Sequence, residues 1–529
     1  MRARARPRRP HPVPSPAERS PLVPCLALCG IDRTLCAEFP KRLRRQPCMD
    51  RQAWVWSRRE FGRVDLGDTR RTARLIAMGA AACERPSGRV AAVFQSHRER
   101  EGAYDFLESE DVTPEEILRG VMTATLARSA ELPFVFVPVD GTSISVVDRT
   151  AERDFGSVGS DAQGARGAKV IDALAVDPQG TVLGWLDLTF WARSPTREVP
   201  PRNTHARQAR PVEEKETRYW LQSIKAACAA LEEGKLRGWF QIDREGDGRD
   251  LLLALRDTRH WWTVRGNADR SIELEGGDIG RLRAQLAGSI VAGSYELVMT
   301  ARPKRKARSA RMVVRVAQVL LRLRDQRTGR ITRMPVTAVW AREEGTTPAG
   351  EDPIDWLLYT NRTVETFDDA RLVIYGYTQR WRVEECHRTW KRGGCDVEST
   401  QLRSFAALQR WAIVLGAVAT RIERMKRLAR SRPSEPATIE LNPFELQALR
   451  MIRLETYPSA TNAPTIAEAV DWIAELGGYA NKYSGKPPGA IVLERGLSYL
   501  RPAAHLLAIQ HGQASGFPPA PRGGREGGL

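Results

Sequence analysis

The stretch Phe134-Val135-Phe136-Val137-Pro138-Val139-Asp140 decides the fold class of this chain. It is a nearly continuous apolar run that ends in an aspartate, and such a run indicates a buried strand. A second strand of the buried type, Trp239-Phe240-Gln241-Ile242, also runs into an aspartate, Asp243. If the two strands are parallel neighbours, both carboxylates lie at one edge of a sheet.

The segments between these two strands complete an α/β pattern. Strand patterns over Lys169 to Val176 and over Val182 to Trp191, joined by Asp177-Pro178-Gln179-Gly180, predict a β-hairpin. Apolar residues at helical spacing predict an amphipathic helix over Val212 to Leu231. Strands that are followed by alternating helix and strand predict a mixed α/β sheet.

A further block of strand pattern follows the second aspartate. It runs from about Asn267 to Arg342 and predicts an all-β insertion, which we place at about residues 267–345. A basic stretch, Arg302 to Arg311, interrupts it and is either a phosphate-seeking loop or a soluble hairpin tip. After one more strand, Trp356 to Tyr359, helical periodicity begins at Phe367 and continues through most of the remainder.

The N-terminal part of the chain divides into two regions. Residues 1–48 are basic and rich in proline and lack periodicity, so we expect a disordered tail, or an over-extended reading frame whose true start is Met49. Residues 49–130 show the spacing of helices. One of these helices has a basic face formed by Arg70, Arg71 and Arg74. Such a face is usually only solvated, unless a role in binding nucleic acid is supported elsewhere.

Composition limits the function class. The 529 residues include 82 Lys and Arg against 64 Asp and Glu, a formal net charge of +18. Length predicts roughly three or four domains, and the positive excess indicates a polyanionic partner, most commonly nucleic acid. The longest apolar stretch, Trp411 to Thr420, is about half a membrane span, so we expect no membrane partner. The cysteines form no CxxC pair, which is typical of reduced cytoplasmic thiols.

The segment from Tyr377 to Lys391 carries an unusual set of side chains. At about 100° per residue, four of them fall within roughly a 60° arc of a continuous helix, and these are Tyr377, Arg380, Glu384 and Lys391. Glu385 falls outside this stripe, so helical geometry selects Glu384 as the carboxylate aligned with the two cations. An ordinary amphipathic helix with i,i+4 and i,i+7 ion pairs stays open as the alternative.

Asp140, Asp243 and Glu384 form a set of candidate catalytic residues. Singly, each aspartate is also explained as a turn residue or a helix cap. Jointly, three carboxylates repel one another unless cations neutralise them, and hard Mg²⁺ or Mn²⁺ prefers oxygen ligands. Two such ions about 4 Å apart activate a water or a 3′-hydroxyl and stabilise the leaving oxygen of a phosphodiester. The set therefore predicts a site for two divalent cations.

These motifs resemble a known family. The Y-(2)-R-(3)-E-(6)-K signature of DDE transposases of the insertion sequence 4 family is matched by Tyr377, Arg380, Glu384 and Lys391. Asp140-Gly141-Thr142-Ser143 resembles the segment of the first catalytic aspartate in that family, and Asp243 to Asp247 resembles that of the second. The likeness covers nearly everything after about Trp54.

The resemblance implies an RNase H-like catalytic core over residues 131–430 that contains the β insertion. It also implies a helical DNA-binding domain over residues 49–130 and a helical dimerisation domain over residues 431–529. The implied activity is cut-and-paste transposition of DNA by a homodimer on paired transposon ends, with hairpin formation and strand transfer into target DNA. The implied location is the cytoplasm of a bacterium, in association with the nucleoid when the protein is bound to DNA.

The resemblance also assigns residues. It implies Asp140, Asp243 and Glu384 as catalytic metal ligands for two Mg²⁺ ions per active site, with Mn²⁺ as a substitute. The implied DNA contacts are, besides the basic face of the N-terminal helix, Tyr377, Arg380, Lys391, Arg265 and Trp356. Trp356 would stack on a base that is flipped out during hairpin formation, and a core tryptophan of a strand stays open as its alternative.

Two competing functions remain open from the sequence. One is a metal-dependent nuclease of the same fold that does not join DNA ends to a target. The other is a non-cleaving DNA-binding regulator, or a decayed element, that binds transposon ends. The intact set of three carboxylates argues against the second.

Overall fold

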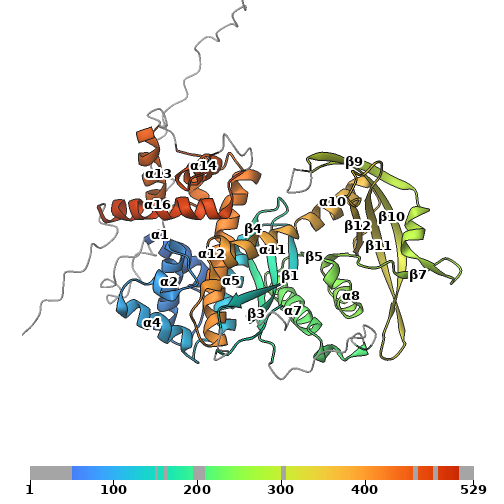
Figure 1. Cartoon of the computed structure of the whole chain (residues 1–529), viewed down its shortest axis with the longest axis horizontal. Coiled ribbons are helices and arrows are strands. Elements are labelled where there is room, and N and C mark those ends of the chain that lie inside the picture. Colours follow the sequence, from blue (N-terminus) through green and yellow to red (C-terminus); the bar gives the residue numbers. More distant parts are fainter. Residues whose placement is uncertain are drawn as a thin grey trace, which may run out of the picture. The chain divides into compact units, whose positions relative to one another are not determined.

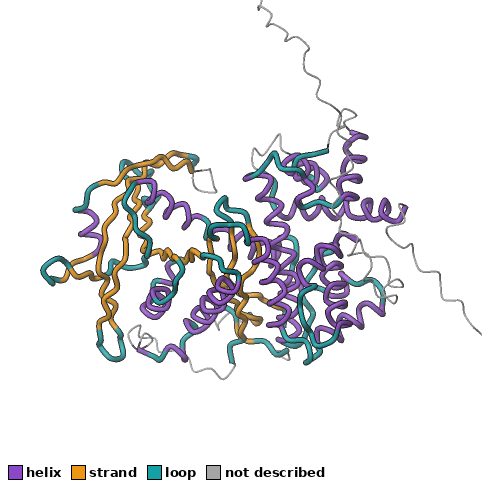
Figure 2. Tube along the Cα trace, turned by 180° about the vertical axis from the view of Figure 1, so that it is seen from behind, coloured by secondary structure: helices purple, strands orange, loops and turns teal. Residues whose placement is uncertain are grey.

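The computed structural model describes residues 51–148, 153–159, 165–194, 206, 209–299, 306–456, 463–480 and 487–510. The expected tail, residues 1–48, lies outside the described residues, as do residues 302–305 of the basic stretch. The described part consists of one large sheet with helices that precede it, cover it and follow it along the chain (Figure 1 and Figure 2). The expected mixed α/β architecture is confirmed.

Helices form the N-terminal part. They are α1 (Arg51–Phe61), α2 (Thr69–Glu84), α3 (Val90–Val93), α4 (His97–Glu108) and α5 (Pro114–Ser129). Side-chain oxygens of Asp68, Ser96 and Thr113 accept hydrogen bonds from the first-turn amides of α2, α4 and α5. These caps satisfy backbone donors that a helix start leaves without partners, and so they set where each helix begins.

Twelve strands form the sheet. Their order is β2-β3-β1-β5-β6-β12-β11-β10-β7-β8, with β4 on β3 and β9 on β10. The first six strands are β1 (Val135–Val146), β2 (Gly156–Ser157), β3 (Arg166–Val176), β4 (Val182–Trp191), β5 (Gly238–Ile242) and β6 (Trp261–Arg265). The others are β7 (Ser271–Glu273), β8 (Ile279–Arg281), β9 (Val291–Met299), β10 (Arg308–Arg324), β11 (Ile331–Glu343) and β12 (Asp355–Thr360).

β1 and β5 are parallel neighbours, as expected of the two strands that run into an aspartate. Their parallel register ends at Val139 and Ile242, one residue before each aspartate. The expected end of the first strand at Asp140 is wrong. β1 continues to Val146, because its residues from Asp140 onward stay paired with the antiparallel β3. Asp140 thus lies within a strand, whereas Asp243 follows one.

The two longest strands of the insertion, β10 and β11, form one antiparallel hairpin. The expectation that the insertion is all-β is wrong in one place, because the short helix α9 (Leu282–Ala287) lies between β8 and β9. Leu282 and Leu286 of α9 are buried, and their apolar contacts hold this helix in place. β12 then pairs with both β11 and β6, so the insertion continues the same sheet.

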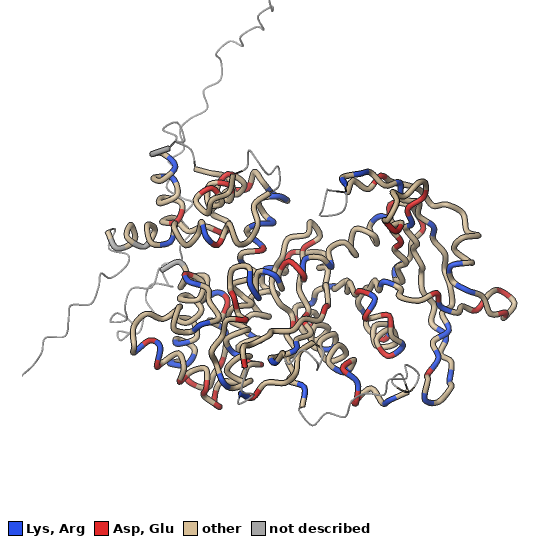
Figure 3. Tube along the Cα trace, in the orientation of Figure 1, with Lys and Arg blue, Asp and Glu red and all other residues tan. Residues whose placement is uncertain are grey.

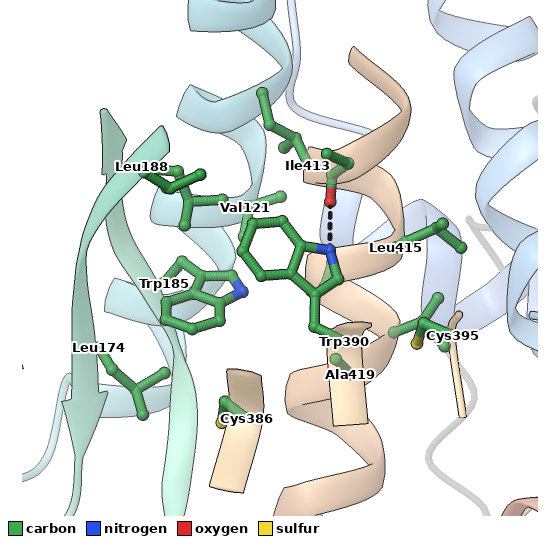
Figure 4. Close-up of a cluster of buried hydrophobic side chains, with 14 of the residues drawn as sticks. Val121, Leu174, Trp185, Leu188, Cys386, Trp390, Cys395, Ile413, Leu415 and Ala419 are labelled. Carbon is green, nitrogen blue, oxygen red and sulfur yellow. Dashed lines mark hydrogen bonds between the residues drawn. The ribbon is translucent and has the colours of Figure 1, made fainter. Parts of the chain in front are cut away.

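Helices cover both faces of the sheet beside the two aspartates. α7 (Thr217–Glu233), which follows a short 3₁₀ turn (η4, Val212–Glu214), and α8 (Arg249–Arg256) share one apolar core with the sheet. α12 (Phe405–Ser431) belongs to the other core. Figure 4 shows part of that second core, where the rings of Trp185 and Trp390 lie 6.0 Å apart and Trp390 Nε1 donates to the carbonyl oxygen of Ala412 at 3.0 Å.

α12 is the one described helix that is long and apolar enough to cross a membrane. Yet 83% of its most apolar window is buried inside the protein, and the core helix of a soluble protein passes the same test. α12 also buries charged side chains, among them Arg421, Glu423 and Lys426. This feature is therefore only weak evidence for a membrane span.

The C-terminal helices have an apolar core of their own. They are α13 (Pro443–Thr456), α14 (Ile466–Leu476) and α16 (Ala490–Gln510), preceded by the 3₁₀ turn η8 (Ala437–Ile439). A capping box between Thr465 and Glu468 begins α14. Met425 and Leu428, near the end of α12, join this core, so α12 connects the sheet with the C-terminal helices.

Candidate active site

The segment from Tyr377 to Lys391 is not the continuous helix that its spacing predicts. It comprises the end of α10 (Phe367–Thr378), then α11 (Trp381–Arg388) and the π-helical turn η6 (Thr389–Gly393). The amides of Gln379 and Arg380 donate to carbonyl oxygens three residues earlier, and this tighter turn separates α10 from α11. Arg380 and Glu384 keep their i,i+4 relation, because both lie after this break.

α10 is fixed at both of its ends. At its start, the side chains of Thr366 and Asp369 form a capping box with the backbone. Near its end, Gly376 lies so close to β1 that a Cβ atom there would be 2.7 Å from Cε1 of Phe136. This close approach brings Tyr377 to the ends of β1 and β5.

Asp140, Asp243 and Glu384 all contact the guanidinium group of Arg380. Arg380 Nη1 lies 2.9 Å from Asp140 Oδ2, and Nη2 lies 2.6 Å from Glu384 Oε1 and 3.5 Å from Asp243 Oδ2. The side chain of Arg380 is 6% exposed, whereas that of Glu384 is 32% exposed. Three carboxylates from β1, from the end of β5 and from α11 therefore converge on one buried cation.

Tyr377, Arg265 and Trp356 line the Asp243 side of this cluster. The Tyr377 hydroxyl donates to Asp243 Oδ1 at 2.8 Å, and Arg265 Nη1 at the end of β6 lies 3.9 Å from the same oxygen. The half-buried Trp356 on β12 packs edge-on against the Tyr377 ring, with centroids 5.5 Å apart. The structure thus groups these three predicted contacts with the carboxylates.

Lys391 reaches the far end of β1. Its Nζ lies 3.4 Å from Oγ1 of Thr142, two residues beyond Asp140, and 3.5 Å from Oε1 of Glu398. Glu398 also accepts a hydrogen bond from the backbone amide of Ser145 on β1. Glu398 therefore holds Lys391 beside the strand that carries the first aspartate, a role that sequence reasoning missed.

The environment changes the pKa values of these groups. Burial raises the pKa of Asp140 to about 6, although His387 and Arg380 act in the opposite direction. Burial would also raise the pKa of Asp243, but Arg380 and hydrogen bonds from Arg244 and Tyr377 hold it below its usual value. The pKa of Tyr377 rises to about 12, through burial first and the Asp243 charge second. Arg380 stays protonated, because Asp140 and Asp243 raise its pKa against the effect of burial.

The donor set fits a divalent cation. Three carboxylates contact Arg380, and Arg265 lies near one of them, so the cluster has a formal excess of one negative charge (3 − 2 = 1). Carboxylate oxygens are the ligands that Mg²⁺ and Mn²⁺ prefer. Among the described residues, no three His, Cys, Asp or Glu side chains lie close enough together to hold an ion as they stand. A metal would therefore draw the carboxylates from Arg380 toward itself.

The basic residues of α2 lie elsewhere. Arg70, which is 90% exposed, pairs with Asp68 at 2.7 Å, and Arg71 pairs with Asp111. Arg74 packs beside Gly102 of α4. Lys and Arg residues are spread over the described elements rather than gathered in one of them (Figure 3).

Comparison with family models identifies two domains. A transposase DNA-binding model matches residues 53–112, which include α2 and its basic face. A transposase DDE domain model matches residues 203–420, which include Asp243 and Glu384. The pair is that of a DDE transposase. The DDE match begins after Asp140, so the assignment of the first aspartate depends on its geometry in this transposase.

A buried pair beside the cluster also escaped sequence reasoning. Asp172 on β3 is directly opposite Asp140 in the β1–β3 ladder, and its Oδ2 lies 2.6 Å from His387 Nε2 on α11. One signal was visible, because Asp172 is a single acid within the apolar run of a strand. Its partner could not be read from the sequence, since His387 follows 215 residues later.

Proposed function

We propose that this transposase cuts and pastes DNA, and that it belongs to the insertion sequence 4 family as a relative of the transposase of transposon Tn-five. One observation carries the proposal: Asp140, Asp243 and Glu384 come from three separate elements and contact the same guanidinium of Arg380. Structural ion pairs rarely bring together more acids than cations, because the excess charge destabilises the fold, and here three acids have only Arg380 and the more distant Arg265. Such an excess is expected where metal ions bind.

An RNase H-like core is part of the proposal. Its support is the order β4-β3-β1-β5-β6, in which β3 pairs antiparallel with β1 and β4, and β1, β5 and β6 are parallel. Ligands of open α/β sheets lie beyond the carboxyl ends of the parallel strands. Asp140 and Asp243 follow the paired parts of β1 and β5 at that end.

The proposed metal ligands are the three carboxylates. Asp140, Asp243 and Glu384 would together hold two Mg²⁺ ions, or Mn²⁺ in their place. When bound, these ions make water or a 3′-hydroxyl more nucleophilic and stabilise the leaving oxygen of a phosphodiester. Arg380 would then be free to bind a DNA phosphate, because its guanidinium would no longer be needed to neutralise the carboxylates.

The remaining residues of the site would bind DNA. Lys391 would contact a phosphate near the cut, and Tyr377 and Arg265 would contact the end DNA. The aromatic pair of Trp356 and Tyr377 would provide a surface on which an unpaired base stacks. The basic face of α2, which consists of Arg70, Arg71 and Arg74, would add phosphate contacts within the DNA-binding domain.

The reaction would proceed by exchange of phosphodiester bonds. A water oxygen attacks phosphorus at the transposon end, and the broken P–O bond leaves a 3′-hydroxyl and a 5′-phosphate. That hydroxyl attacks the opposite strand, which closes a hairpin and releases the flanking DNA. A second water reopens the hairpin, and the 3′-hydroxyl joins target DNA. Each step forms one P–O bond and breaks another, so no oxidant or nucleotide cofactor is consumed.

The proposed organisation has three regions: DNA-binding residues 49–130, catalytic residues 131–430 and C-terminal residues 431–529. The C-terminal helices would mediate the homodimer on paired ends. The protein would act in the cytoplasm of a bacterium, at the nucleoid.

The first experiment uses the inverted repeats that flank the reading frame. Purified protein is incubated with a duplex of that end sequence, with Mg²⁺ or with EDTA, and the products are separated on a denaturing gel. We expect a hairpin-ended product that depends on Mg²⁺, and a pre-cut end should join plasmid DNA. Cleavage of the end without joining to plasmid DNA would favour a metal-dependent nuclease of the same fold. Binding of the ends by folded protein without cleavage would favour the regulator or decayed element.

A further inference from the structure

The pair of Asp172 and His387 connects the two sides of the active site. Asp172 is fully buried on β3, opposite Asp140 of β1, and His387 lies about one helical turn after Glu384 on α11. The bond of 2.6 Å between them is thus a direct link between the strand beside the first aspartate and the helix that carries the glutamate.

The energetics of this pair make the link strong. Burial raises the pKa of Asp172, and it would lower that of His387, but the Asp172 carboxylate raises the His387 pKa instead. Asp172 Oδ1 has no hydrogen-bond partner among the described residues. A buried carboxylate without its partner is costly, so displacement of α11 from β3 is strongly opposed.

α11 is also held from its other side. Glu385 pairs with Arg382 of the same helix and lies 3.7 Å from Lys426 of α12. These contacts attach α11 to α12, whereas the His387 contact attaches it to β3. Only the His387 contact connects the helix of Glu384 with β3, the strand that pairs with β1 at Asp140.

We propose that Asp172 and His387 are positioning residues that set the separation of Asp140 and Glu384, and thereby the affinity of the site for divalent cations. This inference rests on the proposed metal-dependent function. A positioning role explains why an ion pair is buried here, although apolar side chains of similar volume would fill the same space at a lower cost in folding free energy. It also differs from a packing role, because it predicts a loss of metal affinity without a loss of DNA binding.

The chain offers a matched control, Asp187. This residue is also a buried aspartate, 7% exposed, on the adjacent strand β4. Its Oδ2 accepts a hydrogen bond from Thr189, and it forms no ion pair with any residue that the structure describes. Asp187→Asn therefore makes the same chemical change at a similar depth, without touching the contact to α11.

The test measures Mn²⁺ binding by the full-length protein on the flanking-end duplex, through the electron paramagnetic resonance signal of free Mn²⁺. Removal of groups that orient metal ligands costs about 10–100-fold in affinity. We expect Asp172→Asn and His387→Gln each to weaken Mn²⁺ binding about tenfold, at the lower end of that range. The double variant should be no weaker than the weaker single variant, because the two residues act through one contact.

Three measurements decide the outcome. They are the Mn²⁺ affinity of Asp172→Asn and His387→Gln, the Mn²⁺ affinity of Asp187→Asn, and the affinity of each variant for end DNA. End-DNA affinity and the Mn²⁺ affinity of Asp187→Asn should stay within about twofold of wild type, because this change leaves the contact of Asp172 with His387 in place. Unchanged Mn²⁺ affinity in Asp172→Asn and His387→Gln, or an equal loss in Asp187→Asn, would overturn the inference alone. If one variant does not fold, the other decides. Wild-type protein that binds end DNA but no Mn²⁺ would instead overturn the proposed function, and the inference with it.

Discussion

Glu384 and Glu385 are neighbours on α11, yet the two faces of the helix on which they lie have different charge balances. Glu384 is 32% exposed and shares Arg380 with Asp140 and Asp243. Glu385 is 17% exposed and has the cations of Arg382 and Lys426 beside it. On the first face three acids have two cations, Arg380 and Arg265, whereas on the second face Glu385 and Glu423 are matched by Arg382 and Lys426.

This difference distinguishes a site from a structural contact. Burial would raise the pKa of Glu385, but Lys426 and Arg382 lower it, so this face needs no further cation. On the other face burial raises the pKa of Asp140 to about 6, which indicates a carboxylate that lacks sufficient positive charge. The same residue type one position apart therefore serves the fold in one case and, as we propose, the chemistry in the other.

The largest expected effect is that of Glu384→Gln. The amide keeps the size of the side chain but loses the charge that a metal ion needs, which is worth several kcal/mol of transition-state stabilisation. We expect cleavage of end DNA to fall about a thousandfold, since each 1.36 kcal/mol is a factor of ten. Affinity for end DNA, measured by gel shift, should be retained.

Glu385→Gln is the matched control for that change. It should keep cleavage by the folded protein within about tenfold and lower the free energy of unfolding by about 1–3 kcal/mol, because it leaves buried cations without their acceptor. Urea unfolding and a cleavage time course check both values. If Glu385→Gln abolished cleavage and Glu384→Gln did not, the assignment of the two faces would be reversed.

The sequence predicted much of this comparison. Apolar runs before Asp140 and Asp243 predicted two buried strands and left open whether they are parallel neighbours, which the pairing of β1 with β5 shows. Helical spacing selected Glu384 over Glu385, and this choice agrees with the side of α11 that faces Arg380. The helical spacing between Arg380 and Glu384 applies even though the segment is divided at Gln379, because both residues lie after that break.

Other features depend on contacts that one sequence does not encode locally. The link of Asp172 to His387 and that of Glu398 to β1 join residues that lie 215 and 253 positions apart. The continuation of β1 past Asp140 is a result of pairing with β3, and strand ends depend on such neighbours more than on local propensity. The same dependence explains α9, which is only six residues long and is held by burial of Leu282 and Leu286.

Arg380→Lys tests the cation that contacts Asp140, Asp243 and Glu384. A lysine ammonium cannot present the planar fork that contacts Asp140 and Glu384 together. We expect cleavage of end DNA to fall about 10–100-fold, within the range for loss of a group that orients metal ligands. Arg382→Lys on the opposite face is the control and should reduce cleavage less than tenfold, as for a residue outside the site. Equal losses in both variants would contradict a special role for Arg380.

Lys426→Met tests the structural face from the side of α12. Lys426 is 8% exposed and pairs with Glu423 and Glu385, so its loss leaves two buried acids without this cation. We expect the free energy of unfolding in urea to fall by about 3–5 kcal/mol, the usual result of removing one partner of a buried pair. Lys225→Met on the exposed side of α7 is the control, with an expected change within about 0.5 kcal/mol. Cleavage by the folded fraction should be unchanged.

Asp187 extends the comparison to a buried acid with no cation among the described residues. Burial raises its pKa from 3.8 to about 6, so between these pH values the folded state holds a proton that the unfolded state has lost. The stability from this residue is therefore present below about pH 4 and is lost as the pH rises to about 6, by at most about 3 kcal/mol. Asp187→Asn cannot titrate, so its urea unfolding energy should fall less over this range than that of wild type. Parallel pH profiles for the two proteins would mean that the pKa of Asp187 is not raised in the folded protein, and that burial on β4 alone does not keep a proton on this carboxylate.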